Sequence, residues 1–198
     1  RGLCLRSLFR HPECPRSYAA WDIGVPMHFP DLAKTLPDYA KDLRLNTSSL
    51  LAEQLLTDQQ KYGTLVAVAH ATACRPVIAA AEAEAEGKIS PEAMNAAKAA
   101  ASIMAMNNIY YRFTHMASRP DYKTMPAKLR MNVIGSPGID KADFELFSLA
   151  VSAVNGCGMC VEAHDKVLAG HGMAAEKIQA AVRIAAVVHA VARTLQAL

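Results

Sequence analysis

Apolar side chains recur three and four residues apart along most of the chain, which is the spacing of one face of an α-helix. The clearest case follows Asp140, where apolar residues keep this spacing and also fill the other helix faces. These residues are Phe144, Leu146, Phe147, Leu149, Ala150, Val151 and Val154. A helix that is apolar nearly all round is a buried one, so this segment is predicted to cross the core.

Start and stop signals divide the rest of the chain into further helices. Ser90 followed by Pro91 is typical of a helix start, and Gly87 of a helix end. The pattern predicts helices over residues 31–43, 58–70, 75–86, 91–113, 157–168 and 174–198, with another capped segment after Asn46, Thr47 and Ser48. Residues 119–138 contain several prolines and glycines and are predicted to connect two halves.

The two halves match each other at an offset of 83 residues. Identical residues at this offset include Cys74 with Cys157 and Gly87 with Gly170. We interpret the match as a helical duplication, with a first repeat at about 58–115 and a second at about 140–198.

Composition supports an all-α fold. The chain of 198 residues is rich in alanine and has one tryptophan and few aromatic residues, which favours closely packed helices over a sheet. Residues 27–198 are long enough for one domain with a buried core. Residues 1–26 lack periodicity, so we interpret them as a non-native or disordered leader that precedes Met27.

Charge and apolar run length argue against nucleic acid and membranes as partners. The formal net charge is +3, of which residues 1–26 carry +2, so the remaining chain is nearly neutral and has no basic stripe. No apolar run reaches the ~18 residues of a membrane helix, because charged and polar residues interrupt each one. Five cysteines without an apolar signal segment favour a reducing, cytoplasmic location.

Candidate chemistry gathers in the segment from Cys157 to His164, which reads C-x-x-C-x-x-x-H. Positions three, four and seven apart share one helix face, so Cys157, Cys160 and His164 are predicted to point to the same side. Asn155 and Gly156 place Cys157 at the first turn, where free backbone N–H groups favour a thiolate. This position also makes a reversible disulfide to Cys160 feasible.

Glu145 is the candidate partner for the imidazole of His164. The two residues are far apart along one straight helix, but a turn at Asn155 and Gly156 would produce an antiparallel helix pair and bring them to the same level. A carboxylate at that point orients the ring and raises its basicity. We therefore expect a relay from Cys160 through His164 to Glu145.

Other interpretations of these residues remain open at this stage. The two cysteines and His164 are a possible zinc site with Cys74 or His70 as a fourth ligand, or the cysteines are an inert buried pair. His70, His115, His171 and His189 have no evident partner and are interpreted as surface residues or satisfied core residues. A patch of Met104, Met106, Asn107, Asn108, Tyr110 and Tyr111 is interpreted as packing or a subunit interface.

Several segments resemble the AhpD alkylhydroperoxidases of the carboxymuconolactone decarboxylase-like superfamily. They are MHFPDLAKTLPDYAKDLRLN at 27–46, MNNIYYR at 106–112, LRMNVIGSPG at 129–138 and FELFSLAVSAVNGCGMCVEAH at 144–164. Together they extend over nearly all of the chain after residue 26.

The resemblance implies an all-helical, two-repeat fold, assembled as a homotrimer, and an antioxidant enzyme that reduces hydroperoxides with a dithiol. It implies no tightly bound cofactor. Electrons are expected to come from dihydrolipoamide on the lipoylated E2 component of a 2-oxoacid dehydrogenase, and the enzyme is expected to regenerate the peroxiredoxin AhpC.

The resemblance also implies a role for each site residue. Cys160 would be the peroxidatic thiol, Cys157 the more accessible resolving thiol, and His164 with Glu145 the proton relay. Family members often carry histidine between the cysteines, where this chain has Met159, so a second proton path is in doubt. The alternatives are a non-redox carboxymuconolactone decarboxylase-like enzyme and a metal-binding or interaction module.

Overall fold

A computed structural model of the chain describes residues 27–198, and this part is entirely helical, as the all-α prediction required. The interpretation of residues 1–26 as a leader lies outside the described residues. The elements are α1 (Phe29–Lys34), η2 (Asp38–Ala40), α2 (Lys41–Leu51), α3 (Asp58–Ala71), α4 (Arg75–Ala85), α5 (Pro91–Met116), α6 (Asp121–Thr124), α7 (Asn132–Gly135), α8 (Lys141–Val154), α9 (Gly158–Gly170) and α10 (Ala175–Gln196).

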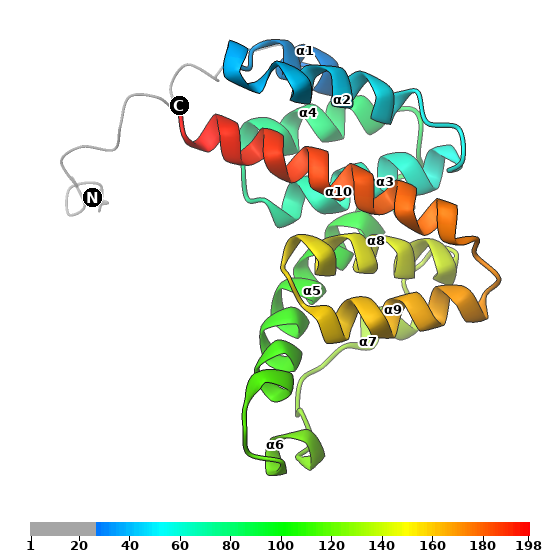
Figure 1. Ribbon diagram of the computed structural model, residues 1–198. Coiled ribbons are helices and arrows are strands. Elements are labelled where there is room, and N and C mark those ends of the chain that lie inside the picture. The colour runs from blue at the N-terminus through cyan, green and yellow to red at the C-terminus, as the bar shows by residue number, and fades with distance from the viewer. Residues whose placement is uncertain (1–26) are drawn as a thin grey trace, which may run out of the picture.

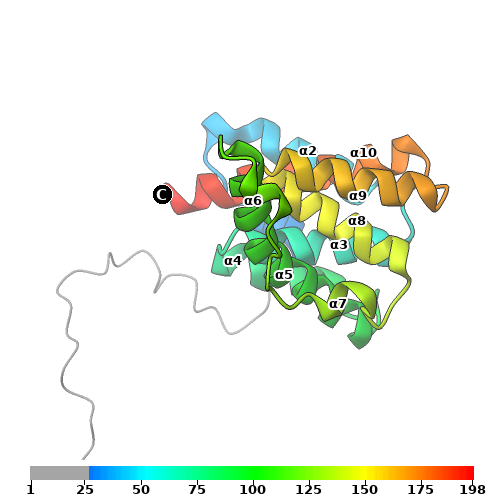
Figure 2. The ribbon, with the colours of Figure 1, turned by 90° about the horizontal axis from the view of Figure 1, so that it is seen from below.

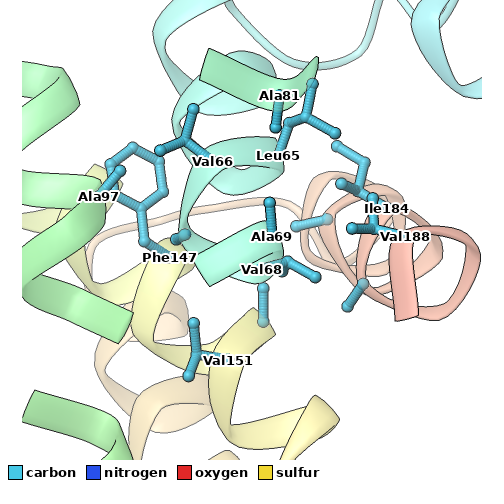
Figure 3. Packing of buried hydrophobic residues seen from close by; sticks show 14 of the residues in the cluster. Leu65, Val66, Val68, Ala69, Ala81, Ala97, Phe147, Val151, Ile184 and Val188 are labelled. Carbon is cyan, nitrogen blue, oxygen red and sulfur yellow. The ribbon is translucent and has the colours of Figure 1, made fainter. Parts of the chain in front are cut away.

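Helix α3 lies at the centre of the core. Its residues from Gln60 to Ala69 are all buried, and α4, α5, α8 and α10 pack around it (Figure 3). The buried cluster joins segments far apart in sequence, because it contains Leu65 and Val68 of α3, Val151 of α8 and Val188 of α10. The apolar residues predicted for the segment after Asp140 are buried here, except Val154, which packs against the edge of the core.

Two helical pairs have matching boundaries at the offset found in the sequence. Helices α3 and α8 have the same length, and their N-cap residues Thr57 and Asp140 are 83 residues apart. Cys74 and Cys157 are in turn the N-caps of α4 and α9, and the residues before them, Ala73 and Gly156, both have a left-handed backbone. This correspondence supports the interpretation as a duplication.

Helices α3 and α8 contact each other near their N-terminal ends. Gln60 of α3 donates a hydrogen bond from Nε2 to Oδ1 of Asp143, which lies 83 residues later, over 2.8 Å. Gln59 donates to the other carboxylate oxygen of Asp143 over 2.6 Å. One turn further along, Gly63 lies directly against the ring of Phe147, which is fully buried. The two helices therefore meet at a polar anchor followed by a very close contact.

The N-terminal helices differ from the sequence prediction. Residues 31–43 were expected to form one helix, but α1 ends at Lys34 and the chain resumes as a 3-10 turn after Pro37. The expected cap at residues 46–48 lies inside α2. There Thr47 and Ser48 bond through their hydroxyls to the carbonyl oxygens of Leu43 and Arg44, four residues earlier, so they act within the helix instead of starting it.

Helix α5 leaves the body of the molecule at its C-terminal end. It starts as predicted, with Ser90 Oγ accepting a hydrogen bond from the backbone N–H of Ala93, and it continues three residues beyond Phe113. Figure 1 shows its last turns extending away from the other helices, with α6 at the far end. Residues 119–138 connect the halves as expected, but they contain two single-turn helices, α6 and α7 (Figure 2).

Within residues 27–198, one helix, α10, is long and apolar enough to cross a membrane by length and composition alone. A core helix passes the same test. Ile184, Val188 and Val191 of α10 are buried in the core, in contact with α3 and α8, and its exposed face carries charged and polar residues. The packing of α10 is that of a core helix.

Candidate active site

The turn between α8 and α9 positions the two cysteines. Gly156 provides the left-handed backbone of this turn, with a φ of 67°. Helix α5 anchors the turn from the side, because Arg112 donates to the carbonyl oxygen of Asn155 over 2.6 Å. Asn108 contacts the same turn, accepting from Nδ2 of Asn155 and donating to Oγ of Ser152, each over 2.9 Å. The first turn of α9 is therefore fixed in place by side chains of α5.

Cys157 and Cys160 are joined by a disulfide, with an S–S distance of 2.07 Å and Cα atoms 5.3 Å apart. Cys157 is the N-cap of α9 and so lies outside the regular helix, which lets its sulfur reach a residue three positions on. The structure therefore shows the oxidised form of the pair, with one sulfur at the positive end of the helix dipole.

The exposure of the two cysteines differs from the expectation. The resemblance implied that Cys157 is the more accessible thiol, but its exposed fraction is 1% and that of Cys160 is 6%. Cys160 lies one turn further along α9, on the face that borders a cavity, and Cys157 does not border it. The expectation about accessibility was wrong for the chain as described here.

His164 and Glu145 are in direct contact. Helices α8 and α9 lie side by side and run antiparallel (Figure 1). This arrangement places His164 Nδ1 2.6 Å from Glu145 Oε2. Both side chains are largely buried, with 12% and 5% of their surface exposed. Because a carboxylate only accepts hydrogen bonds, Nδ1 carries the proton of this bond and the tautomer of a neutral ring is fixed. In that state Nε2 has a free lone pair and can act as a base.

The second ring nitrogen of His164 faces a methionine in the disulfide form. Nε2 lies 3.3 Å from Sδ of Met104, which belongs to α5. No hydrogen bond joins the ring to either cysteine sulfur among residues 27–198. The predicted relay is therefore assembled from Glu145 to His164, while the link to Cys160 is not closed in this oxidised form.

A cavity of about 360 Å³ borders Cys160 and His164. Its other lining residues are Met104, Asn107 and Tyr111 from α5, Met131 and Ile134 near α7, and Met159 and Ala163 from α9. Met159 thus adds a thioether to the lining. The wall is overwhelmingly apolar, so the cavity presents one sulfur and one imidazole to an organic ligand.

Three of these lining residues correct the sequence interpretation. Met104, Asn107 and Tyr111 were assigned to packing or an interface, but they line the same cavity as Cys160. Their spacing of three and seven residues places them on one face of α5, which is a signal that the sequence contained. Met131 and Ile134 gave no such signal, because their place in the wall depends on how the connector folds back.

The remaining candidates lie away from the disulfide. His70 was expected to lack a partner, but its Nε2 lies 2.8 Å from Oε1 of Glu82. Cys74 is a buried free thiol, and burial raises its pKa above the usual value. Within the described residues, no group of three or more His, Cys, Asp or Glu side chains is arranged to hold a metal ion. The sulfurs proposed as zinc ligands are instead bonded to each other.

Comparisons with known proteins identify the family of the chain. Residues 120–198 match the carboxymuconolactone decarboxylase family. Three similar proteins bear the name alkyl hydroperoxide reductase AhpD. The protein from Rhizorhabdus wittichii is 63% identical over 84% of this chain and 96% of its own length. Those from Hyphomonas neptunium and Brucella suis are 60% and 57% identical, each over 86% of this chain and over 95% and 98% of their own lengths.

Proposed function

The chain belongs to the AhpD alkyl hydroperoxide reductases, peroxidase-type enzymes of the carboxymuconolactone decarboxylase family, and we propose that Cys157 and Cys160 are its redox centre. The observation that carries this proposal is their disulfide at the start of α9, beside the buried pair of His164 and Glu145 and at the edge of an apolar cavity. A reversible bond between adjacent sulfurs can pass two electrons from a dithiol to a peroxide.

Cys160 is the proposed peroxidatic residue because its sulfur borders the cavity. Its thiolate attacks the distal oxygen of a hydroperoxide, the S–O bond forms and the O–O bond breaks. The organic fragment leaves as an alkoxide and takes up a proton to become the alcohol. Cys157 then attacks the resulting sulfenic acid, and the disulfide forms with release of water. This sequence oxidises two thiols for each peroxide reduced.

His164 is the proposed proton carrier, with Glu145 as the group that orients it. In the reduced enzyme Cys160 is released from Cys157, so its sulfur can approach Nε2 of His164 in place of Met104. Nε2 then takes the thiol proton, and the neighbouring carboxylate of Glu145 stabilises the charged ring. The same proton can afterwards be delivered to the leaving alkoxide.

Dihydrolipoamide on a lipoylated 2-oxoacid dehydrogenase E2 component is the proposed electron donor. Its thiolate attacks Cys160, the sulfur that borders the cavity, and Cys157 leaves as a thiolate at the N-terminus of α9. The positive end of the helix dipole stabilises that leaving group. A second donor thiol then closes the lipoyl disulfide and frees Cys160. The reduced pair would also regenerate the peroxiredoxin AhpC by the same type of exchange.

We extend the proposal to the organisation of the protein. Residues 27–198 would form one domain of two related repeats, acting as a homotrimer in the cytoplasm without a tightly bound cofactor and without contact to membranes or nucleic acid. The matching boundaries of the helical pairs α3–α4 and α8–α9 support the repeats.

Single-turnover kinetics test the assignment of the two sulfurs. The reduced wild-type protein should consume one equivalent of cumene hydroperoxide in stopped flow and lose two thiols. Cys160→Ser should lose this reaction, whereas Cys157→Ser should react once and stop at a sulfenic acid that dimedone traps. Cys74→Ser removes the buried thiol outside the site and should behave as wild type. Full activity in Cys160→Ser would overturn the assignment.

A further inference from the structure

One polar side chain in the wall of the cavity has no structural role that the contacts reveal. Asn107 lines the cavity on α5 and is 5% exposed, and its Oδ1 is fully buried without a hydrogen-bond partner. No other hydrogen bond of its side-chain amide is present among residues 27–198. A buried amide in this condition destabilises the protein unless a ligand or water binds it.

The neighbouring asparagine shows the contrast. Asn108 is 1% exposed, and both ends of its amide are used, one by Ser152 and the other by Asn155. Asn108 therefore holds the turn between α8 and α9. Asn107 faces a different side of α5 and is the amide that remains available to a ligand in the cavity.

The rest of the wall offers little other polar chemistry. Tyr111 directs its hydroxyl to Sδ of Met131 over 3.9 Å, and Nδ1 of His164 is engaged by Glu145. Met131 and Ile134 supply an apolar surface opposite α9. A ligand that fits this cavity needs an apolar body and one small polar end that reaches Cys160 and the amide.

We propose that Asn107 is a further catalytic residue of this cavity, which hydrogen-bonds the peroxide group of a hydroperoxide whose carbon chain lies against Met131 and Ile134. The inference rests on the proposed function, because it adds a residue to that site. Oδ1 of Asn107, the atom without a partner, accepts the hydrogen bond of the peroxide O–H. Nδ2 donates to the proximal oxygen, on which negative charge builds as the Cys160 thiolate takes the distal oxygen. That donor stabilises the leaving alkoxide without itself transferring a proton.

The apolar wall predicts a preference among peroxides. Hydrogen peroxide has no organic group, so it gains the amide contact and none of the contact with Met131 and Ile134. An alkyl hydroperoxide such as cumene hydroperoxide gains both, because contact with the wall removes its apolar surface from water. The second-order rate constant should therefore be higher for cumene hydroperoxide than for hydrogen peroxide.

Two variants test the two parts of the binding site separately. Asn107→Leu removes the amide at similar volume, and it should lower the rate of sulfenic acid formation with both peroxides by about tenfold or more. Asn107→Ala should act in the same direction if the leucine disturbs packing. Met131→Gln should lower the rate for cumene hydroperoxide by about tenfold and that for hydrogen peroxide far less. Asn95→Leu, at an exposed position of the same helix, is the matched control.

Exchange of the disulfide with dihydrolipoamide, followed by counting free thiols, separates the failure of this inference from that of the proposed function. Circular dichroism should show the wild-type helical content in both Asn107 variants, which establishes that they are folded. Wild-type rates of peroxide reduction in both of them, or equal losses with both peroxides in Met131→Gln, would overturn the inference alone. A wild-type protein that exchanges with dihydrolipoamide but reduces neither peroxide would overturn the proposed function and this inference with it.

Discussion

A role in packing does not explain why the Glu145 side chain is buried. This side chain is 5% exposed on a helix whose buried residues are mainly apolar, and its hydrogen-bond partner among the described side chains is His164. A buried carboxylate without a partner destabilises the fold, so Glu145 requires His164 as its partner. The chain keeps both groups beside the disulfide, where an oriented imidazole is useful.

Glu145→Gln should separate the charge of this residue from its shape. Glutamine can still bond to the ring, but it lacks the negative charge that stabilises a protonated imidazole. We expect the second-order rate constant for cumene hydroperoxide to fall about 10²-fold in single-turnover stopped flow, with unchanged helical content by circular dichroism. Glu162→Gln, on the exposed face of α9, should react as wild type. An undiminished rate in Glu145→Gln would remove the carboxylate from the relay.

Cys74 has the same place in the first repeat that Cys157 has in the second, but its environment differs. Burial raises the pKa of the Cys74 thiol, so at neutral pH it holds less of the reactive thiolate than an ordinary cysteine. In the reduced native protein, iodoacetamide should label Cys160 at least about tenfold faster than Cys74, as measured by peptide mass spectrometry. The difference should disappear in guanidinium. Equal labelling of the native protein would contradict a protected Cys74.

The close contact between α3 and α8 depends on a residue without a side chain. A Cβ added to Gly63 would overlap the ring of Phe147, which is fully buried in the core. Gly63→Ala should therefore lower the free energy of unfolding by about 1–3 kcal/mol, measured by urea denaturation followed by circular dichroism. Gly170→Ala, where a Cβ meets nothing within 4 Å, is the control and should change stability far less. A stable Gly63→Ala protein would mean that the two helices separate easily.

The sequence predicted the helices whose signals are local. Ser90 with Pro91 marked the start of α5, and the apolar spacing around Phe147 identified α8 as a buried helix. The prediction was wrong where one residue type is compatible with two positions in a helix. Thr47 is a good cap, but in the folded chain its hydroxyl bonds to the carbonyl oxygen of Leu43 within α2. Only the packing of α2 on the rest of the molecule decides between these two roles.

The candidate site was predictable as far as it lies on one stretch of chain. The spacing of Cys157, Cys160 and His164 places them on one face, and a turn at Gly156 brings Glu145 to them. The cavity was not predictable in this way, because Ile134 comes from the connector and Met104 from a helix of the other half. Residues from three separate segments meet only once the core has assembled.

At the scale of the whole molecule, the two helical pairs have matching boundaries but differ in the residues at the positions of the candidate site. In the first repeat, the positions that correspond to Cys160, His164 and Glu145 are occupied by Val77, Ala81 and Tyr62, all of which are buried. The first helical pair thus fills these positions with core side chains, and the groups proposed to react lie in the second pair. Helix α5, which follows the first helical pair, contacts the second pair and anchors the turn before Cys157.

That same helix leaves the body of the molecule at its C-terminal end (Figure 1). It carries a strip of exposed apolar side chains there. Ile109, Phe113 and Met116 are 61%, 50% and 75% exposed, and their spacing places them on one face of α5. Apolar groups that share one face in this way are typical of a surface that another chain covers. We therefore expect the proposed homotrimer to use this strip, which lies on the helix that also supplies Met104, Asn107 and Tyr111 to the cavity.

Phe113→Glu should break this contact, because it would bury a charge in the interface. Light scattering after size exclusion should then show a trimer for the wild type and a smaller species for the variant. Leu45→Glu, at a position of α2 that is 68% exposed, provides a charge control away from the strip and should leave the trimer intact. A trimer that survives Phe113→Glu would place the interface elsewhere. A dissociated variant with slower peroxide reduction would show that assembly also supports the cavity wall on α5.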